Sequence, residues 1–307
     1  MDNLTIGIDI GGTRTKYGLV DITNGYLLET AIHPTEKKNE SAFFEQANTA
    51  VSQLRSRALQ LGRTVTGIGI GVSSFVHANG IVDSTYGFQE FLEDYPLQSR
   101  FEDKFNLPVR IDNDARAVAL GEALYGKGKN IQRVLSLTLG TGLGFGFVVN
   151  GRFPDALALS HMAGHIVIAD SDVRCYCGKT GCLESLVSSF GIINAAKKFG
   201  WQGDSSHSSF SEEIFSKAKE ANMIARDIVN HMLLHLQTGI QNYVNLFAPD
   251  IIILGGGIAQ GLIPFADRLA MNPYLKPYKN YQFQIAISEL GEKAGIMGSA
   301  ALISLPS

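Results

Sequence analysis

The chain has 307 residues, a formal charge of −3 and 45% hydrophobic residues, and only 18% of its residues are charged. This balance excludes the strongly basic surface of a nucleic-acid-binding protein, and no apolar run reaches the ~18 residues that a membrane helix needs. No signal peptide is visible, so we expect a cytoplasmic protein. The 33 glycines, about 11% of the chain against a usual ~7%, indicate many close backbone approaches, as nucleotide sites need.

The first half of the chain is predicted to begin with a β-meander and to continue with helices and parallel strands. Apolar runs between Gly and Asn turns predict the strands, and apolar residues at helical spacing predict the helices. The predicted strands cover residues 4–10, 16–21, 26–32, 68–72 and 109–111, and the predicted helices cover 41–61, 97–106 and 115–126.

The second half repeats this order. It opens with a predicted hairpin, 134–139 and 144–149, and continues with helices at 222–247, 259–271 and 293–304 and strands at 251–254 and 283–287. The repetition predicts an α/β fold of two similar domains around a central cleft. We place the first domain at residues 1–114 and the second at 115–292, with the last helix, 293–307, packed back on the first.

Glycine turns after three predicted strands are the candidates for phosphate binding. Their backbone N–H groups and hydroxyls suit phosphate oxygens, and Asp9 can hold Mg²⁺ through water. The segment 121–127 also has P-loop spacing, but Gly128 replaces the required Ser or Thr, and the dinucleotide pattern G-x-G-x-x-G is absent. The predicted ATP-binding residues are Asp9, Gly11, Gly12, Thr13, Lys16, Gly140, Thr141, Gly142, Gly255, Gly256 and Gly257.

All three cysteines of the chain, Cys175, Cys177 and Cys182, lie close together after His165. Three thiolates and one imidazole satisfy tetrahedral Zn²⁺, and a site with four protein ligands is structural. His161 competes for the fourth position, and three buried thiols without a metal are the alternative. A second pair of possible ligands, His231 and His235, lacks a third ligand nearby in the sequence, and we expect a structural role for it.

Together these motifs resemble the ROK (repressor, ORF, kinase) family of sugar kinases, which have the actin-like ATPase fold of duplicated ribonuclease-H-like domains. The resemblance covers essentially the whole chain. Repressor members carry a DNA-binding helix-turn-helix before the first phosphate hairpin, whereas here eight residues precede Asp9, so we expect a kinase member. The resemblance is carried by Asp9 to Lys16, Asn113-Asp114, Leu139 to Gly144, Gly164-His165, the cysteine cluster and Gly255 to Gly257.

The resemblance implies that Asp114 is the base that accepts the proton of a sugar hydroxyl and that Asn113 binds the sugar. One carboxylate near the nucleophile suits phosphoryl transfer with Mg²⁺, although Asp112 and Asp114 alone would equally suit a helix cap. The resemblance also favours His165 over His161 as the metal ligand, implies sugar contacts for His165 and Glu184, and implies a homodimer. We therefore expect an ATP-dependent sugar kinase with Mg²⁺ and structural Zn²⁺.

The chain departs from the family pattern before His165. The family usually reads Gly-Glu-x-Gly-His, and Met162 stands where that Glu belongs; the segment 71–75 also lacks the usual Pro-Gly or Gly-Gly turn. The departure favours a sugar with absent or modified hydroxyls, such as a glycoside. The rival interpretations are that His161 replaces the Glu or that the pocket has decayed. Two other functions stay open: a catalytically weak sugar-binding regulator and an actin-like ATPase that drives an assembly.

Overall fold

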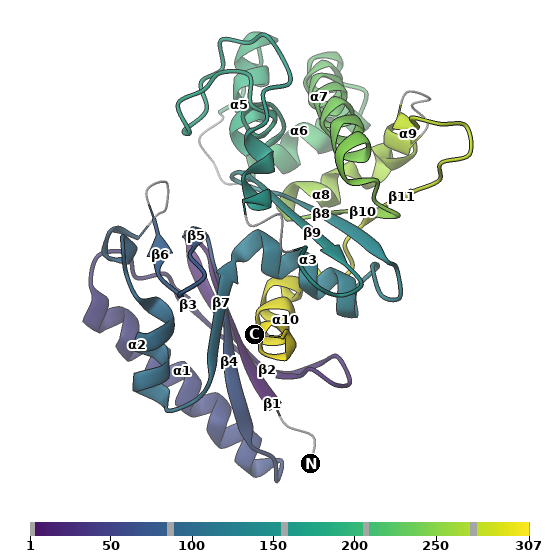
Figure 1. Ribbon diagram of the computed structural model, residues 1–307. Helices are drawn as coiled ribbons and strands as arrows, with labels where there is room; N and C mark the ends of the chain where they lie inside the picture. Colours follow the sequence, from purple (N-terminus) through teal and green to yellow (C-terminus); the bar gives the residue numbers. More distant parts are fainter. Residues whose placement is uncertain (1–3, 85–88, 155–158, 205–208, 271–274, 307) are drawn as a thin grey trace. The chain divides into compact units, whose positions relative to one another are not determined.

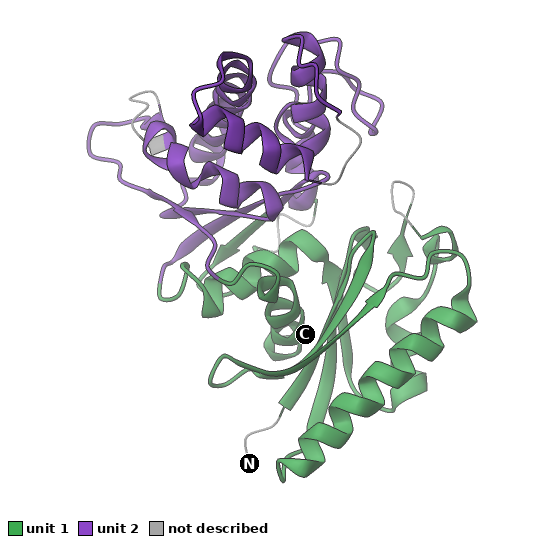
Figure 2. Cartoon of the chain, turned by 180° about the vertical axis from the view of Figure 1, so that it is seen from behind, with its two compact units in different colours: residues 1–130, 146–159, 290–307 green, residues 131–145, 160–289 purple. Residues whose placement is uncertain are grey.

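The computed structural model describes residues 4–84, 89–154, 159–204, 209–270 and 275–306. They form two compact units (Figure 2): unit 1 has residues 1–130, 146–159 and 290–307, and unit 2 has residues 131–145 and 160–289. Helix α3 (Asp114–Tyr125) thus lies in unit 1, whereas we expected the second domain to begin at residue 115. The predicted helix over 259–271 reaches residue 271, and the expected domains include 1–3 and 307; these residues lie outside the described part of the chain.

Unit 1 is built on a five-stranded sheet with the order β3-β2-β1-β4-β7 (Figure 1). The first three strands form the antiparallel meander, and β4 and β7 run parallel to β1. The carboxyl ends of β1, β4 and β7 therefore lie at one edge, where the register aligns Asp9 with Gly71 and Gly71 with Asp112. The strands are β1 (Leu4–Ile10), β2 (Arg14–Asp21), β3 (Tyr26–Pro34), β4 (Val65–Val72) and β7 (Val109–Asn113).

Helices cover both faces of this sheet. On one face, α1 (Glu40–Gln60) and α2 (Leu97–Phe105) pack on the isoleucines of β1 and β4. On the other, α10 (Lys293–Ala301) lies directly on the strands, because a Cβ at Gly7 would meet Ile296 O at 1.9 Å and one at Gly69 would meet Ser299 O at 1.7 Å. Side chains alternate between faces along a strand, so these glycines bring α10 onto the face opposite the isoleucines. The smaller elements of unit 1 are β5 (Phe75–Val76), β6 (Val82–Asp83) and η1 (Glu90–Leu92).

Unit 2 carries the parallel strands β8, β10 and β11 of a sheet with the order β11-β10-β8-β9; β9 begins in unit 2, and its residues from Gly146 on belong to unit 1. The longest helix of unit 2, α7 (Met223–Phe247), packs against α4, α5 and α6. The strands are β8 (Arg133–Leu139), β9 (Leu143–Val149), β10 (Ile251–Gly255) and β11 (Gln284–Ile287). The other helices are η3 (Ser160–His165), α4 (Leu183–Val187), α5 (Ser189–Lys198), α6 (Phe210–Lys219), α8 (Gly257–Leu262), η4 (Ile263–Phe265) and α9 (Ala266–Ala270), and η6 (Leu302–Ser304) follows α10 in unit 1.

The sequence predicted the strands of both sheets to within a few residues at each end. It missed α4, α5 and α6, and it joined α8, η4 and α9 into one helix. Among the described residues, no helix is long and apolar enough to cross a membrane.

Candidate active site

Asp9 is the one acidic residue of β1 and lies partly buried, with its side chain 16% exposed, at the carboxyl edge of the unit 1 sheet. Burial raises the pKa of its carboxyl group, and the Lys16 ammonium, with Nζ 3.5 Å from Asp9 Oδ2, partly offsets this. The carboxylate of Glu292 lies 3.9 Å from Lys16 Nζ, and its charge also raises the pKa of Asp9, by less than burial does. Helix α10 closes the other side, since a Cβ at Gly295 would lie 2.8 Å from the Asp9 carboxylate. A partly buried carboxylate held this closely is suited to a bound cation.

Thr35, which follows the last strand of the meander, fixes the turn after Asp9 through two hydrogen bonds. Thr35 Oγ1 donates to Gly11 O at 2.7 Å, and Thr35 N donates to Thr13 O at 3.0 Å. Gly11 N closes the turn by donating to Arg14 O at 3.1 Å. The carbonyl groups of Gly11, Thr13 and Arg14 are therefore bonded within unit 1. Sequence analysis missed Thr35, because it lies outside every motif.

Asn113 is the N-cap of α3, and most of its hydrogen-bonding capacity is used within unit 1. Its Oδ1 accepts from Ala115 N at 3.0 Å and from Arg116 N at 3.3 Å, and its Nδ2 donates to Ser74 O at 3.1 Å. An amide group has two donor hydrogens, so a single N–H of Asn113 is left for another partner. Asp112 does not cap the helix; it accepts from its neighbour's N–H and from Arg116 Nε, each within 2.8 Å.

Asp114 follows at the first position of α3, and its carboxylate is partly buried. Burial and the charge of nearby Asp9 raise its pKa to about 6. The backbone N–H of Ala115, which donates at 2.8 Å, and the hydroxyl of Ser73 act in the opposite direction by stabilising the carboxylate. The group is thus mostly ionised at neutral pH yet more basic than an exposed aspartate, as a general base should be. No sequence motif indicated that Ser73 bonds to the Asp114 carboxylate.

In unit 2, two of the three predicted glycine turns lie side by side. Gly256 has φ of +83°, and a Cβ there would meet Leu139 O at 2.2 Å, so the turn after β10 packs directly on the end of β8. A Cβ at Gly140 or Gly257 would meet nothing within 4 Å. The ends of two parallel strands thus present backbone groups beside open space, where ligands bind in α/β sheets.

The cysteine cluster is assembled as the spacing predicted. The ligand atoms of His165, Cys175, Cys177 and Cys182 all lie within 4.8 Å of one another, and the described residues contain no other such group of three or more. Cys175 Sγ lies 3.4 Å from His165 Nδ1, and Cys177 Sγ lies 3.6 Å from Cys182 Sγ. Ligands around tetrahedral zinc with Zn–S bonds of ~2.3 Å are separated by about 3.8 Å, so the four side chains fit this ion.

Protonation in the cluster follows from burial and from its hydrogen bonds. Burial raises the pKa of Cys175 and of Cys182 and lowers that of His165. Burial also opposes ionisation of Cys177, but hydrogen bonds from Lys179 N–H and from the other two thiols outweigh it and lower its pKa. Cys177 is therefore the first thiol to ionise, and the neutral imidazole of His165 has a free lone pair for a metal. On the far side of the ring, Nε2 lies 3.0 Å from the hydroxyl oxygen of Tyr176.

Glu184 lies at the start of α4, beside this cluster. Its Oε1 is 3.7 Å from His165 Nδ1, and its Oε2 accepts from Leu143 N at 3.0 Å. Met162 and His161 lie in η3, the short helix that ends at His165, and Tyr243 fixes this helix by donating to Ala163 O at 2.8 Å. Unit 2 therefore brings His165 and Glu184 to the cysteine cluster, and Met162 lies three residues before His165 on η3.

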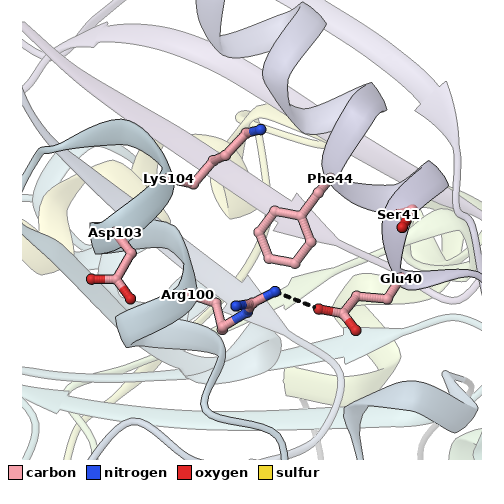
Figure 3. A pocket seen from close by; sticks show the side chains of 6 residues that line it. All are labelled: Glu40, Ser41, Phe44, Arg100, Asp103 and Lys104. Atoms are coloured by element: carbon pink, nitrogen blue, oxygen red, sulfur yellow. Dashed lines mark hydrogen bonds and ion pairs between the residues drawn. The ribbon is translucent and has the colours of Figure 1, made fainter.

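A surface groove of about 310 Å³ lies elsewhere in unit 1, between the beginning of α1 and α2 (Figure 3). Within it, Arg100 donates to Glu40 Oε1 at 2.9 Å and lies over the Phe44 ring. None of the predicted site residues lines this groove; its lining is Glu40, Ser41, Phe44, Arg100, Asp103 and Lys104.

Comparisons with known proteins match nearly the whole chain to members of one family. The model of the ROK family matches residues 5–305. A glucokinase of Halalkalibacterium halodurans is 29% identical over 98% of this chain and 95% of its own length. A xylose repressor of Caldicellulosiruptor bescii is 27% identical over 97% of this chain and 77% of the repressor. A crystal structure of a ROK family glucokinase from Streptomyces griseus, in complex with glucose and AMPPNP, has 27% identity and a TM-score of 0.78, and the match covers 98% of this chain and 99% of that one. These matches confirm the predicted family resemblance and the actin-like ATPase fold.

Proposed function

Because the chain belongs to the ROK family, we propose that it is an ATP-dependent sugar kinase in which Asp114 is the general base. The observation that carries this proposal is the partly buried Asp114 carboxylate, whose pKa is raised to about 6 by desolvation and by the charge of nearby Asp9. The glucokinases from Halalkalibacterium halodurans and Streptomyces griseus support the reaction class, and the AMPPNP bound to the latter supports ATP as the phosphoryl donor.

In the proposed reaction, the glycine turns bind the nucleotide through backbone N–H groups other than those of Gly11 and Gly140, which donate within their own turns. Asp9 and the turn at Gly11, Gly12 and Thr13 act with Lys16 in unit 1, and Gly140, Thr141, Gly142 and Gly255 to Gly257 act in unit 2. Mg²⁺, when bound near Asp9, neutralises charge on the phosphate oxygens. Phosphoryl transfer needs mainly positioning and charge stabilisation, so a single base is enough for the chemistry.

Asp114 removes the proton from the attacking sugar hydroxyl. Asn113 contributes its one remaining N–H and thus acts toward the sugar only as a donor. We assign His165 and Glu184 to the sugar as well, on the family resemblance. Zn²⁺ bound by His165, Cys175, Cys177 and Cys182 has four protein ligands, so its role is to shape the segment that carries these two side chains.

Sugar-dependent release of ADP tests this proposal. Purified protein is assayed with Mg·ATP against hexoses, N-acetylated amino sugars, ketoses, rare epimers and β-glycosides. Asp114→Asn should lower kcat by ~10²–10⁴ while it leaves sugar affinity largely intact, the range expected when a general base is lost. Asp112→Asn is the matched control, because Asp112 bonds Arg116 and the chain but not the reacting groups. Equal losses in the two variants, or near-wild-type turnover in Asp114→Asn, would remove Asp114 from the mechanism.

We further propose that the preferred sugar has an absent or modified hydroxyl near its anomeric carbon. The support is Met162, which cannot accept the hydrogen bonds of the Glu that family members usually have there. A charged hydrogen bond contributes ~1.5–3 kcal/mol, so Met162→Glu should raise kcat/KM for free hexoses by at least about tenfold and should not improve that for glycosides. An unchanged preference in this variant would favour His161 as the replacement for the missing Glu.

A sugar-binding regulator without strong kinase activity is the alternative. Met162 and the similarity to the xylose repressor favour it. Silence across the sugar panel from folded protein, with a sugar that still raises the Tm, would support this alternative. A homodimer, a cytoplasmic location and the absence of a nucleic-acid partner remain predictions; sedimentation analysis of the purified protein tests the first.

A further inference from the structure

A single buried side chain, Glu184, contacts both the glycine turn and the cysteine cluster of unit 2. Its Oε2 accepts from Leu143 N–H at 3.0 Å, and its Oε1 lies 3.5 Å from Cys175 Sγ and 3.7 Å from His165 Nδ1. The side chain is only 8% exposed. The two oxygens of one carboxylate thus face two different parts of the unit.

Two further hydrogen bonds fix the turn at Gly140 to Gly142. Gly140 O accepts from Ser189 N at 2.9 Å at the start of α5, and Gly140 N donates to Gly142 O at 3.0 Å within the turn. Leu143 N–H is a buried donor, and a buried donor without a partner is strongly unfavourable. The position of the turn at its Leu143 end therefore depends on Glu184.

The cluster in turn fixes Glu184. Cys182 is the N-cap of α4, the short helix that carries Glu184 two residues later. Its Sγ lies 3.5 Å from His165 O, and the next residue, Leu183, donates its N–H to Ile166 O at 2.9 Å. When the cluster holds a metal, the segments before and after it are tied together at the base of this helix.

We propose that Glu184 is a positioning residue for the nucleotide, which holds the Leu143 end of the turn from the wall of the cysteine cluster. Nucleotide affinity then depends on the integrity of the cluster, although the cluster itself need not touch the nucleotide. The inference rests on the proposed function, because it takes the turn at Gly140 to Gly142 as a phosphate-binding element. It gives Glu184 a role that is separate from the sugar contact.

The test is the Kd of Mg·AMPPNP, measured by titration calorimetry without sugar, so that a lost sugar contact has no influence. Glu184→Met removes both oxygens at similar size, whereas Glu184→Gln keeps one acceptor for Leu143 N–H. We expect Glu184→Met to weaken binding by at least about tenfold and Glu184→Gln to stay within about twofold of the wild type. The zinc content of each variant is measured alongside and should be equal. Unchanged binding in Glu184→Met, or an equal loss in Glu184→Gln, would overturn the proposal.

A second pair of variants keeps the test valid if Glu184→Met does not fold. A Cβ at Gly142 would lie 2.8 Å from Glu184 Oε2, whereas one at Gly140 meets nothing within 4 Å. Gly142→Ala should therefore weaken nucleotide binding more than Gly140→Ala does, because it also displaces the carboxylate. Equal effects of the two alanines contradict the inference.

Removal of zinc tests the dependence on the cluster. Chelation should weaken Mg·AMPPNP binding by several-fold in the wild type and have little further effect in Glu184→Met. An undiminished affinity of the zinc-free wild type would overturn this dependence. If the zinc-loaded wild type itself does not bind Mg·AMPPNP, the proposed function fails; if it binds and phosphorylates a sugar while Glu184→Met binds equally well, only this inference fails.

Discussion

Replacement of Ser73 by alanine isolates one contribution to the basicity of Asp114. The Ser73 hydroxyl donates to the Asp114 carboxylate and so stabilises its ionised form, while burial and Asp9 act in the opposite direction. A hydrogen bond to a charged group is worth ~1.5–3 kcal/mol, and one pKa unit corresponds to about 1.4 kcal/mol. Because water replaces part of the lost bond, we take the lower end of this range. We therefore expect Ser73→Ala to raise the pKa of Asp114 from about 6 to about 7.

The consequence is a shift of the acid limb of the pH–rate profile. A general base acts when deprotonated, so activity falls as the pH drops through its pKa. At pH 6 the ionised fraction should fall from about one half to about one tenth, so that kcat/KM falls about fivefold, whereas at pH 8 it should change by only about 10%. Mg²⁺ near Asp9 would lower the pKa of Asp114 by similar amounts in the wild type and in Ser73→Ala. The difference between the two proteins would therefore remain.

The assay is kcat/KM between about pH 5 and pH 9 for the wild type, Ser73→Ala and the control Ser74→Ala. Ser74 is the matched control for two reasons. Its hydroxyl has no hydrogen-bond partner within the described residues. Asn113 donates to the backbone carbonyl of Ser74, which an alanine at this position retains. We expect the acid limb of Ser74→Ala to coincide with that of the wild type. An unmoved limb in Ser73→Ala, or the same shift in both variants, would refute the assignment of this limb to Asp114.

Two further predictions concern the metal and the packing of α10. Protein prepared without chelators should contain about one zinc ion per chain by elemental analysis, and its removal should lower the Tm; less than half an equivalent contradicts the zinc assignment. Gly69→Ala should lower the Tm by several degrees, because its Cβ would lie 1.7 Å from Ser299 O on the backbone of α10, and overpacking costs ~1–3 kcal/mol. Gly140→Ala, which meets nothing within 4 Å, is the control for that melting experiment, and equal Tm values in the two variants would refute the packing argument.

Local patterns carried most of the sequence prediction. The hairpins around Gly11 and Gly140 could be predicted because a strand, a glycine turn and a second strand are adjacent in the chain. The cysteine cluster could be predicted because its ligands lie within 17 residues of His165. Helices α5 and α6 were missed: α5 carries Gly191 in its first turn, and both are short. Their helical form depends on packing against α7, which a local pattern does not reveal.

Contacts between distant parts of the chain could not be predicted in this way. Ser73 and Glu184 belong to different motifs from their partners Asp114 and Leu143, and only the parallel strand register and the position of α4 bring each pair together. The family resemblance placed Glu184 near the sugar, but it gave no indication of the hydrogen bond to the turn. Such contacts tune a site whose main residues are already visible in the sequence.

Asn113 combines two roles: the helix cap, which the sequence suggested for its neighbours Asp112 and Asp114, and the sugar contact that the family resemblance implies for Asn113 itself. A polar residue before a helix is typical of a cap, and the same residue in this family pattern indicates a sugar ligand. The structure makes these roles compatible, because the cap uses only Oδ1 and Ser74 O takes one N–H. The bonds of the cap fix the plane of the amide, and so they fix the direction of the one remaining N–H. In the proposed mechanism, capping α3 therefore gives Asn113 the directionality that a sugar-binding donor needs.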